Sequence, residues 1–131
     1  MITVSTCEDF SFIFRECCLG VWDVVKVPFP YTDRPVRQFR PAVVVAADAL
    51  AGEHGLLWVL MITSADNRRW TGDVKLAGLA PTGLPAPSMV RCAKIATIEA
   101  SEAVTLGALS PADRRKVAAN IAKTLRGAMP A

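Results

Sequence analysis

The chain has 131 residues, a length that fits a single domain. Hydrophobic residues make up 52% of it and charged residues 21%, which excludes wholesale disorder and allows a core without disulfides or metal. The net charge of +3 permits an anionic partner without requiring one. No apolar run approaches the roughly 18 residues that a membrane span needs, so we expect no contact with the membrane interior.

Residues 1–20 differ in pattern from the rest, and we treat them as an N-terminal extension of a domain that covers 21–131. They do not resemble a secretory signal, because Glu8 and Asp9 stand where a basic region belongs. A cytoplasmic location is therefore expected. The cysteines lack the C-x-x-C spacing of a zinc site and are typical of reduced thiols, with metal binding or redox sensing as alternatives. They are Cys7, Cys17, Cys18 and Cys92.

From Trp22 onward the sequence reads mostly as strands, which are separated by polar or proline-rich loops. Two of these segments, 40–47 and 56–64, are apolar without alternation, which predicts strands that are buried on both faces. The segment 48–55 is expected to be a loop or one short turn. The predicted strands are 22–29, 40–47, 56–64, 72–76, 88–91 and 94–98, with 104–106 as a further candidate.

The pattern changes near the C-terminus, where Ser110 and Pro111 form the start signal of a helix. Val117, Ile121 and Leu125 recur at every fourth residue and predict an apolar stripe that packs on the sheet. Gly127 is expected to end this helix. Several short strands followed by one helix indicate an α+β, mainly β fold, built as a small twisted sheet or a partly open barrel.

Polar side chains at the margins of the two buried strands are the first candidates for a functional site. Arg40 precedes Pro41, which favours extended backbone, and its planar guanidinium suits phosphate oxygens. Thr63 and Ser64 end the second apolar run with hydroxyl groups. If the strands are neighbours, Arg40 and Thr63 can face one phosphate. Two structural explanations remain open: Arg40 forms a salt bridge at the margin of the sheet, and Thr63 is present only because threonine favours strands.

A second group of candidates lies in the loops and in one apolar stretch. Arg91 interrupts an apolar segment, either as a functional cation or as an edge residue whose stem lies along apolar surface. Arg37, Arg68 and Arg69, with Trp70 beside them, could line a nucleic-acid groove in which bases stack, or they are solvated loop charges. No phosphate-binding glycine loop, metal-ligand cluster or nucleophile motif is present, so neither a metal nor a cofactor is expected.

The ordered set of short motifs resembles the MazF/PemK family of toxins from toxin–antitoxin systems, over roughly residues 21–127. Each motif is weak alone, but their order and spacing together are specific. They are Asp23-Val-Val-Lys-Val-Pro-Phe-Pro, Arg40-Pro-Ala-Val-Val-Val, Ile62-Thr-Ser, Gly72-Asp-Val, Leu84-Pro-Ala-Pro-Ser-Met-Val-Arg91, Ile95-Ala-Thr-Ile and Leu106-Gly-Ala-Leu-Ser110.

The resemblance implies a strongly twisted antiparallel sheet or SH3-like barrel of the MazF/CcdB kind with a C-terminal helix, usually as a homodimer. It also implies a metal-independent endoribonuclease that cuts single-stranded RNA, such as mRNA, at short sequences. A cognate antitoxin protein typically blocks the RNA groove of such a toxin. In the family the active site uses the residues that match Arg40 and Thr63, and some members also use the one that matches Arg91.

The acidic part of the expected site departs from the family pattern. Related toxins often carry an aspartate two residues after the arginine of the V-R motif, where this chain has Ala93. Others carry a glutamate in the loop before the R-P motif, where Asp33 is the candidate general base. Arginine stays protonated near neutral pH, so it stabilises charge more readily than it accepts a proton. Loss of a general base costs ~10²–10⁴-fold in rate.

Two alternative functions remain beside the RNA-cleaving toxin. The first is a catalytically impaired relative that binds RNA or a partner protein without cleavage, and Ala93 is the feature in its favour. The second is a CcdB-like inhibitor of DNA gyrase, for which the chain lacks any resemblance to that family's terminal contact residues. We expect the endoribonuclease.

Overall fold

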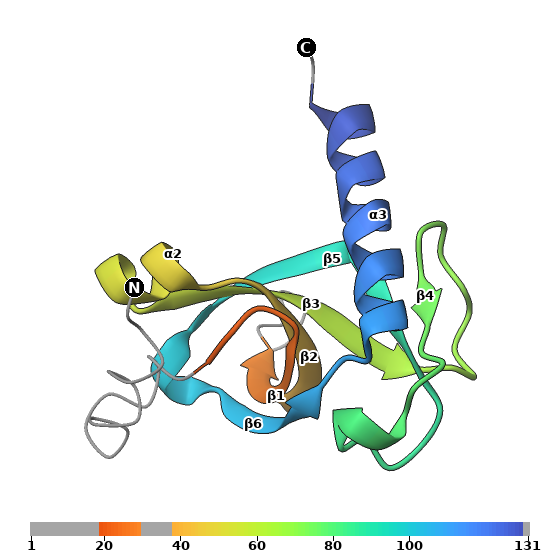
Figure 1. The fold of residues 1–131 in the computed structure, drawn as a ribbon, viewed down its shortest axis with the longest axis horizontal. Helices are drawn as coiled ribbons and strands as arrows, with labels where there is room; N and C mark the ends of the chain where they lie inside the picture. Colours follow the sequence, from red (N-terminus) through yellow and green to blue (C-terminus); the bar gives the residue numbers. More distant parts are fainter. Residues whose placement is uncertain (1–18, 30–37, 130–131) are drawn as a thin grey trace.

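The computed structural model describes residues 19–29 and 38–129, and its centre is a six-stranded sheet that curls into half a barrel (Figure 1). The strands follow the order β4-β5-β3-β2-β1-β6, and each neighbouring pair is antiparallel. Residues 1–18, most of the predicted extension, and the loop with Asp33 and Arg37 lie outside the described ranges. The strands are β1 (Asp23–Phe29), β2 (Gln38–Ala46), β3 (Leu56–Ser64), β4 (Val74–Lys75), β5 (Ser88–Glu99) and β6 (Val104–Ala108).

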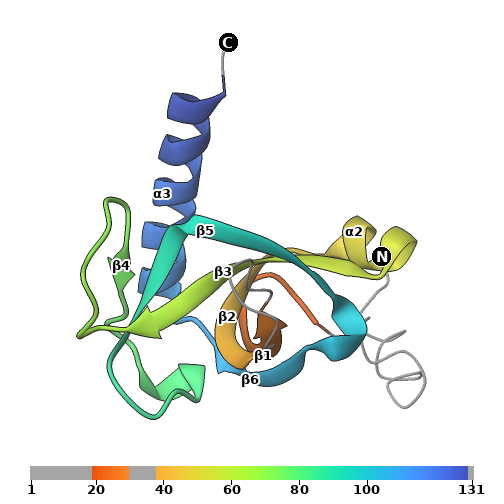
Figure 2. The ribbon, with the colours of Figure 1, turned by 180° about the vertical axis from the view of Figure 1, so that it is seen from behind.

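The central strands carry side chains into two separate apolar cores, one on each face of the sheet. On β2, Val43 belongs to one core, whereas Ala42 and Val44 on either side of it belong to the other. The expectation of strands buried on both faces is therefore confirmed. The first core also takes Leu109 and Val117, which places it under the C-terminal helix. The curl that encloses the second core is visible from behind in Figure 2.

Strand β5 corrects the predicted break between two short strands, because it runs continuously from Ser88 to Glu99. Its pairing with β3 shifts between Leu60, which lies opposite Ile95, and Met61, which lies opposite Arg91. The segment 92–94 is thus extra on β5, as in an extended β-bulge. Bulges bend a strand and increase its twist. The polar and small residues of this segment suggested a gap, whereas the strand accommodates them in the bend.

A short helix, α2 (Asp48–His54), stands where a loop or one turn was expected. It ends at Gly55, which has φ +67° and donates its backbone N–H to the carbonyls of Ala51 and Leu50. Glycine adopts this left-handed conformation without steric cost, which explains the end of the helix there. Ala51 packs against the second core, so that α2 covers one end of it. In the described part of the chain, the 3-10 turns Ala80–Thr82 and Ala100–Glu102 lie in further connections between the strands.

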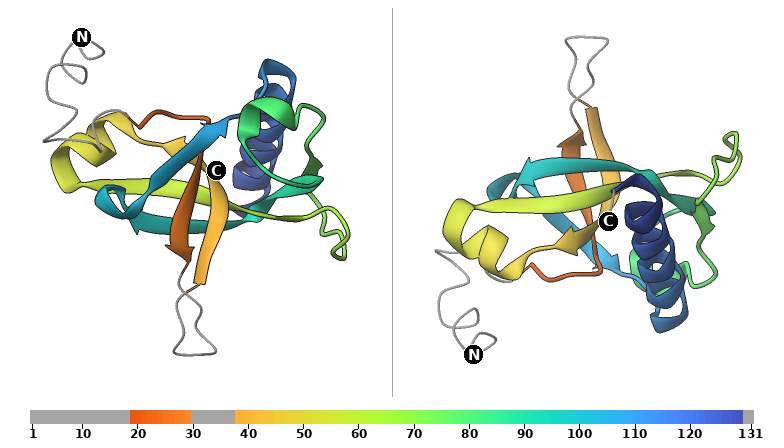
Figure 3. Two further views of the ribbon diagram at one scale, coloured as in Figure 1. Left: turned by 90° about the horizontal axis from the view of Figure 1, so that it is seen from below. Right: turned by 90° about the horizontal axis from the view of Figure 1, so that it is seen from above.

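The C-terminal helix α3 (Pro111–Ala128) begins as predicted, and the Ser110 side chain accepts a hydrogen bond from the Asp113 backbone N–H at 3.3 Å. Val117 is fully buried, but Leu125 is 50% exposed. Only the first half of the predicted stripe packs on the sheet, and the second half projects beyond it (Figure 1). Figure 3 shows the same helix from below and from above. The helix passes through Gly127, which corrects the predicted end. Over 19–29 and 38–129, none of the helices has the length and apolar character to cross a membrane.

Asp113 joins the first turn of α3 to the loop that follows β4. Its carboxylate is completely buried and accepts hydrogen bonds from the backbone N–H groups of Ala77, at 3.1 Å, and Gly78, at 3.0 Å. A Cβ atom at Gly78 would lie 2.8 Å from the Ser110 Cβ, so only glycine permits this approach. The contact fixes the helix against the segment that follows β4, and β4 comes directly after Asp73. It thereby holds one wall of the candidate site.

We predict that Asp113→Ala lowers the free energy of unfolding by about 3 kcal/mol, because it leaves two buried backbone N–H groups without acceptors. Urea unfolding followed by circular dichroism measures the change. Arg115→Ala, on the exposed side of the same helix, should stay within about 0.5 kcal/mol of the wild type. Equal losses in the two variants would contradict a structural role for the Asp113 carboxylate.

Candidate active site

Arg40 and Thr63 lie at the same end and on the same face of two neighbouring strands. Strands β2 and β3 pair with Ala42 opposite Met61. Arg40 precedes Ala42 by two residues and Thr63 follows Met61 by two, and side chains two apart on a strand share a face. The half-buried Arg40 also lies opposite Val27 of β1, whose side chain belongs to the second core. The structure thus brings together the two residues that the sequence singled out first.

The hydroxyl group of Thr63 has a fixed environment. Thr63 is only 5% exposed, and its Oγ1 accepts a hydrogen bond from the Asn67 side-chain amide. With its lone pair so engaged, the hydroxyl keeps its proton available for donation to an anion. The neighbouring Ser64 is exposed, and its Oγ accepts the backbone N–H of Asp66 at 3.2 Å. Asn67 had no signal in the sequence, because an asparagine in a polar loop is unremarkable until the loop folds back on the strand.

Arg91 lies on the same face of the sheet, but it is enclosed. It stands opposite Met61 in the β3–β5 pair and is 8% exposed. Its Nη2 donates to Asp73 Oδ2 at 3.1 Å and to the carbonyl oxygen of Arg68 at 2.6 Å. The Trp70 ring covers the guanidinium, with its centroid 4.0 Å from the guanidinium carbon. This arginine therefore already has a carboxylate, a carbonyl and an aromatic ring as partners.

Asp73 is the second residue that sequence reasoning missed. It belongs to the Gly72-Asp73-Val74 motif, but nothing in that motif shows that its side chain meets an arginine eighteen residues further on. The contact follows from the β4–β5 pairing, in which Val74 lies opposite Val90. The Asp73 side chain has no exposed surface, and its Oδ2 also accepts the Trp70 backbone N–H at 2.8 Å. The Asp73 carboxylate thus connects Arg91 of β5 with the backbone of Trp70 in the loop.

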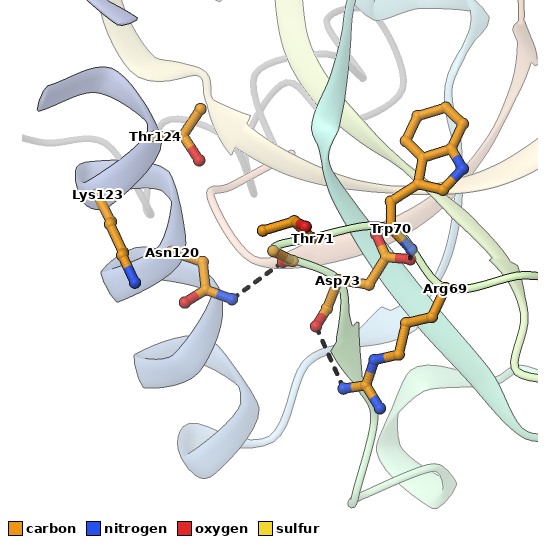
Figure 4. Close-up of a pocket in the computed structure, with 8 residues that line it drawn as sticks. Arg69, Trp70, Thr71, Asp73, Asn120, Lys123 and Thr124 are labelled. Atoms are coloured by element: carbon orange, nitrogen blue, oxygen red, sulfur yellow. Dashed lines mark hydrogen bonds between the residues drawn. The ribbon is translucent and has the colours of Figure 1, made fainter. Parts of the chain in front are cut away.

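The loop 65–73 forms a cleft with α3, with a volume of about 700 Å³ (Figure 4). Asn120 of α3 donates its side-chain N–H to the Gly72 carbonyl at 3.0 Å and ties the loop to the helix. Arg69 and Lys123 supply positive charge, whereas the one carboxylate in the lining, Asp73, is paired with Arg91. The lining residues are Arg69, Trp70, Thr71, Gly72, Asp73, Asn120, Lys123 and Thr124.

The remaining sequence candidates divide between the loop and the undescribed ranges. Arg68, Arg69 and Trp70 are exposed, and Arg69 Nη2 lies 3.5 Å from the Asp73 carbonyl. Asp33 and Arg37 fall outside the described residues. Ala93 is exposed on the bulge of β5. Within the described part of the chain, no group of three or more histidine, cysteine or acidic side chains is arranged to hold a metal ion.

Solved structures of MazF proteins share the fold of this chain. MazF from Deinococcus radiodurans superposes with a TM-score of 0.66 at 20% identity, covering 82% of this chain and 96% of that one. A MazE-MazF structure from the same organism gives 0.62 at 19% identity, covering 82% and 94%. A mycobacterial endoribonuclease in complex with its cognate antitoxin gives 0.67 at 18% identity, covering 86% and 100%.

The family follows from the sequence model that matches residues 21–125. That model describes the PemK-like, MazF-like toxins of type II toxin–antitoxin systems. The match spans most of the chain, and the chain belongs to this family. The resemblance and the fold class that the sequence predicted are both confirmed. A search of curated proteins found no match.

Cys92 follows Arg91 on β5 and gives a chemical probe of this region. Burial, and secondarily the negative charge of Asp73, raises the pKa of its thiol to about 11. We predict that at pH 8 folded Cys92 reacts with iodoacetamide about a hundredfold more slowly than in urea, because only the thiolate is nucleophilic. The rate should then rise about tenfold per pH unit up to about pH 11.

The measurement uses a variant in which Cys7, Cys17 and Cys18 are serine, so that Cys92 is the only thiol. Mass spectrometry follows the labelling. Equal rates in the folded and unfolded protein at pH 8 would show that the thiol is neither buried nor raised in pKa.

Proposed function

We propose that this toxin is a metal-independent endoribonuclease that cuts single-stranded RNA, chiefly mRNA, at specific short sequences. One observation carries the proposal: Arg40 and Thr63 lie at the same end and on the same face of β2 and β3, in a chain of the MazF-like toxin family. A permanent positive charge and a hydroxyl donor placed close together can stabilise the negative charge that develops on a phosphate in the transition state.

The proposed reaction uses the 2′-hydroxyl of the RNA as nucleophile. A bond forms between O2′ and phosphorus, the bond from phosphorus to O5′ breaks, and the products carry a 2′,3′-cyclic phosphate and a 5′-hydroxyl. The proton of the 2′-hydroxyl passes to a general base, and the departing O5′ takes a proton from a water molecule. Positive charge and hydrogen-bond donors around the phosphoryl oxygens lower the barrier, because charge accumulates there in the transition state.

Each residue of the site takes one part in this scheme. The Arg40 guanidinium neutralises the phosphoryl oxygens, for which its planar fork of donors is suited. The Thr63 hydroxyl, oriented by Asn67, donates to the same group. Asp33 is the candidate general base. Arg91 was the third candidate for direct contact with the phosphate, but its enclosure by Asp73 and Trp70 favours the different role argued below.

RNA on either side of the cleaved bond is proposed to run along the loop 65–73. Trp70 is 41% exposed and offers an aromatic surface on which an unpaired base can stack. Arg68 and Arg69 are exposed beside it, and Arg37 is proposed to act with them. Ser64 is exposed at the end of β3 and supplies a further hydrogen-bonding group to the RNA.

We propose two protein partners, a cognate antitoxin and a second copy of the toxin. The MazE-MazF structure and the mycobacterial endoribonuclease bound to its cognate antitoxin support the first. The second rests on the homodimers that the family resemblance implies. An antitoxin that covers the basic loop would block RNA by competing for the same cations. Because mRNA is the substrate, the cytoplasm is the proposed site of action.

A toxin that binds RNA without cutting it is the second candidate, and Ala93 favours it. This residue stands on the bulge of β5 where related sequences often carry an aspartate. Its methyl group cannot accept a proton. RNA binding without cleavage by the wild-type protein would select this function.

We predict that the wild-type toxin cuts single-stranded RNA in the presence of EDTA and that Arg40→Ala lowers kcat by about 10²–10³-fold, as expected for loss of a transition-state charge partner. Expression of the wild type, but not of Arg40→Ala, should arrest growth, and the antitoxin should relieve the arrest. Arg115→Ala is the control for loss of an exposed arginine. Equal cleavage by the wild type and Arg40→Ala would refute the assignment of Arg40.

The Thr63 hydroxyl is tested by a pair of substitutions that separate shape from chemistry. Thr63→Val keeps the branched shape and should lower kcat/KM by about tenfold to a hundredfold through loss of one hydrogen-bond donor to the reacting group. Thr63→Ser restores the hydroxyl and should recover most of the activity. Gel-resolved cleavage of a defined RNA oligonucleotide gives both constants. A fully active Thr63→Val would show that the hydroxyl of Thr63 takes no part in the reaction.

A further inference from the structure

We infer that Asp73 and Arg91 are positioning residues: their buried ion pair holds the loop 65–73 so that Trp70 is presented to RNA. The inference rests on the proposed function, since it concerns how that function's RNA is bound. It assigns a role to Asp73, which sequence reasoning left without one. It also moves Arg91 from contact with the phosphate to support of the loop that presents Trp70 to the RNA.

Both members of the ion pair make hydrogen bonds to the loop 65–73. One nitrogen, Arg91 Nη2, reaches both Asp73 Oδ2 and the Arg68 carbonyl, at 3.1 and 2.6 Å. Asp73 Oδ2 accepts in turn the Trp70 backbone N–H at 2.8 Å, and the Asp73 N–H donates to the Trp70 carbonyl at 3.1 Å. Three residues of the loop are thereby tied to one residue of β5.

Trp70 is held by its side chain as well as by its backbone. Its ring centroid lies 4.0 Å from the Arg91 guanidinium carbon, a distance at which cation and ring attract each other. A planar guanidinium can stack on the indole and donate in its own plane at the same time, whereas the ammonium of a lysine cannot. The indole remains 41% exposed, so part of its surface is left for a nucleobase.

The burial of the Asp73–Arg91 ion pair indicates that the pair positions the loop residues and contributes little to the stability of the fold. The Arg91 and Asp73 side chains are 10% and 0% exposed. Arg91 Nε and Asp73 Oδ1 are buried without a hydrogen-bond partner in the described part of the structure. Desolvating two charges offsets much of their attraction, so an apolar pair would stabilise the fold as well or better. What apolar side chains cannot do is fix three loop residues through directed hydrogen bonds.

The direction in which Asp73→Asn changes RNA affinity distinguishes the positioning role of Arg91 from direct binding of the phosphate. Asp73→Asn removes a negative charge from the basic loop and releases Arg91 from its counter-ion. If Arg91 served RNA by its charge, the variant would bind RNA more tightly. If the pair positions Trp70, the variant binds RNA more weakly despite the favourable change in charge.

The experiment compares Asp73→Asn with Asp66→Asn, the same chemical change at an exposed carboxylate in the same loop. Affinity is measured by fluorescence anisotropy for a single-stranded oligonucleotide with 2′-deoxy sugars, which cannot be cleaved. In parallel, 5-fluorotryptophan and ¹⁹F NMR report on the three tryptophans, with Trp70 assigned from Trp70→Phe. We expect Asp73→Asn to weaken binding at least about tenfold through loss of base stacking, and Asp66→Asn to change it less than about twofold.

The NMR spectrum should show the cause. In Asp73→Asn the Trp70 resonance is expected to shift or broaden, while those of Trp22 and Trp58 stay in place, as they would not if the whole fold had loosened. Unchanged or tighter RNA binding with an unshifted Trp70 resonance overturns the inference. If Asp73→Asn does not fold, Arg91→Lys decides, because it keeps the charge pair but loses the planar fork. Wild-type affinity and an unshifted Trp70 in Arg91→Lys would likewise overturn it.

Failure of the proposed function gives a different result. If the wild-type toxin neither binds nor cuts any single-stranded RNA, the proposed ribonuclease is wrong, whereas the Trp70 resonance of the variants still shows whether the pair holds the loop.

Discussion

The register between β2, β3 and β5 is the constraint on which the site depends. Ala42, Met61 and Arg91 lie in one row across the three strands. Side chains alternate along a strand, so this row places Arg40 and Thr63 on the same face of the sheet, at the same end of β2 and β3. A shift of one residue would turn both side chains into the core beneath α3. The two apolar cores, which bury both faces of β2 and β3, make such a shift costly.

The loop after β3 adds candidate RNA-binding groups to the candidate catalytic residues of this row. It begins at Ser64, sends Asn67 back to the Thr63 hydroxyl, and returns through Asp73 to the arginine of the row. Asn120 anchors it to α3, whose own position depends on the buried Asp113. The cations and the exposed indole of the loop are thus carried by a segment that is tied at several points. In the proposed metal-independent ribonuclease, such prior ordering would replace what a bound ion supplies.

Local patterns in the sequence predicted much of the fold but failed at particular places. The unbroken apolar run at 56–64 indicated β3 with its observed bounds, and Ser110 with Pro111 indicated the start of α3. The break expected near residue 93 was wrong, because a bulge lets β5 continue through polar residues. Gly127 did not end the helix. Its neighbours project beyond the sheet, and backbone geometry there is decided by helical hydrogen bonds alone.

The sequence by itself determined the family and the succession of strands ending in a helix, and it singled out Arg40 and Thr63 as candidates. These depend on motifs and periodicities that lie within a few residues of one another. Only the tertiary structure decided that Asn67 supports Thr63, that Asp73 pairs with Arg91 and that Trp70 covers the guanidinium. Two of these three contacts join residues about twenty apart, and the hydrogen-bonded register of the strands between them, together with the return of the loop, sets which side chains meet.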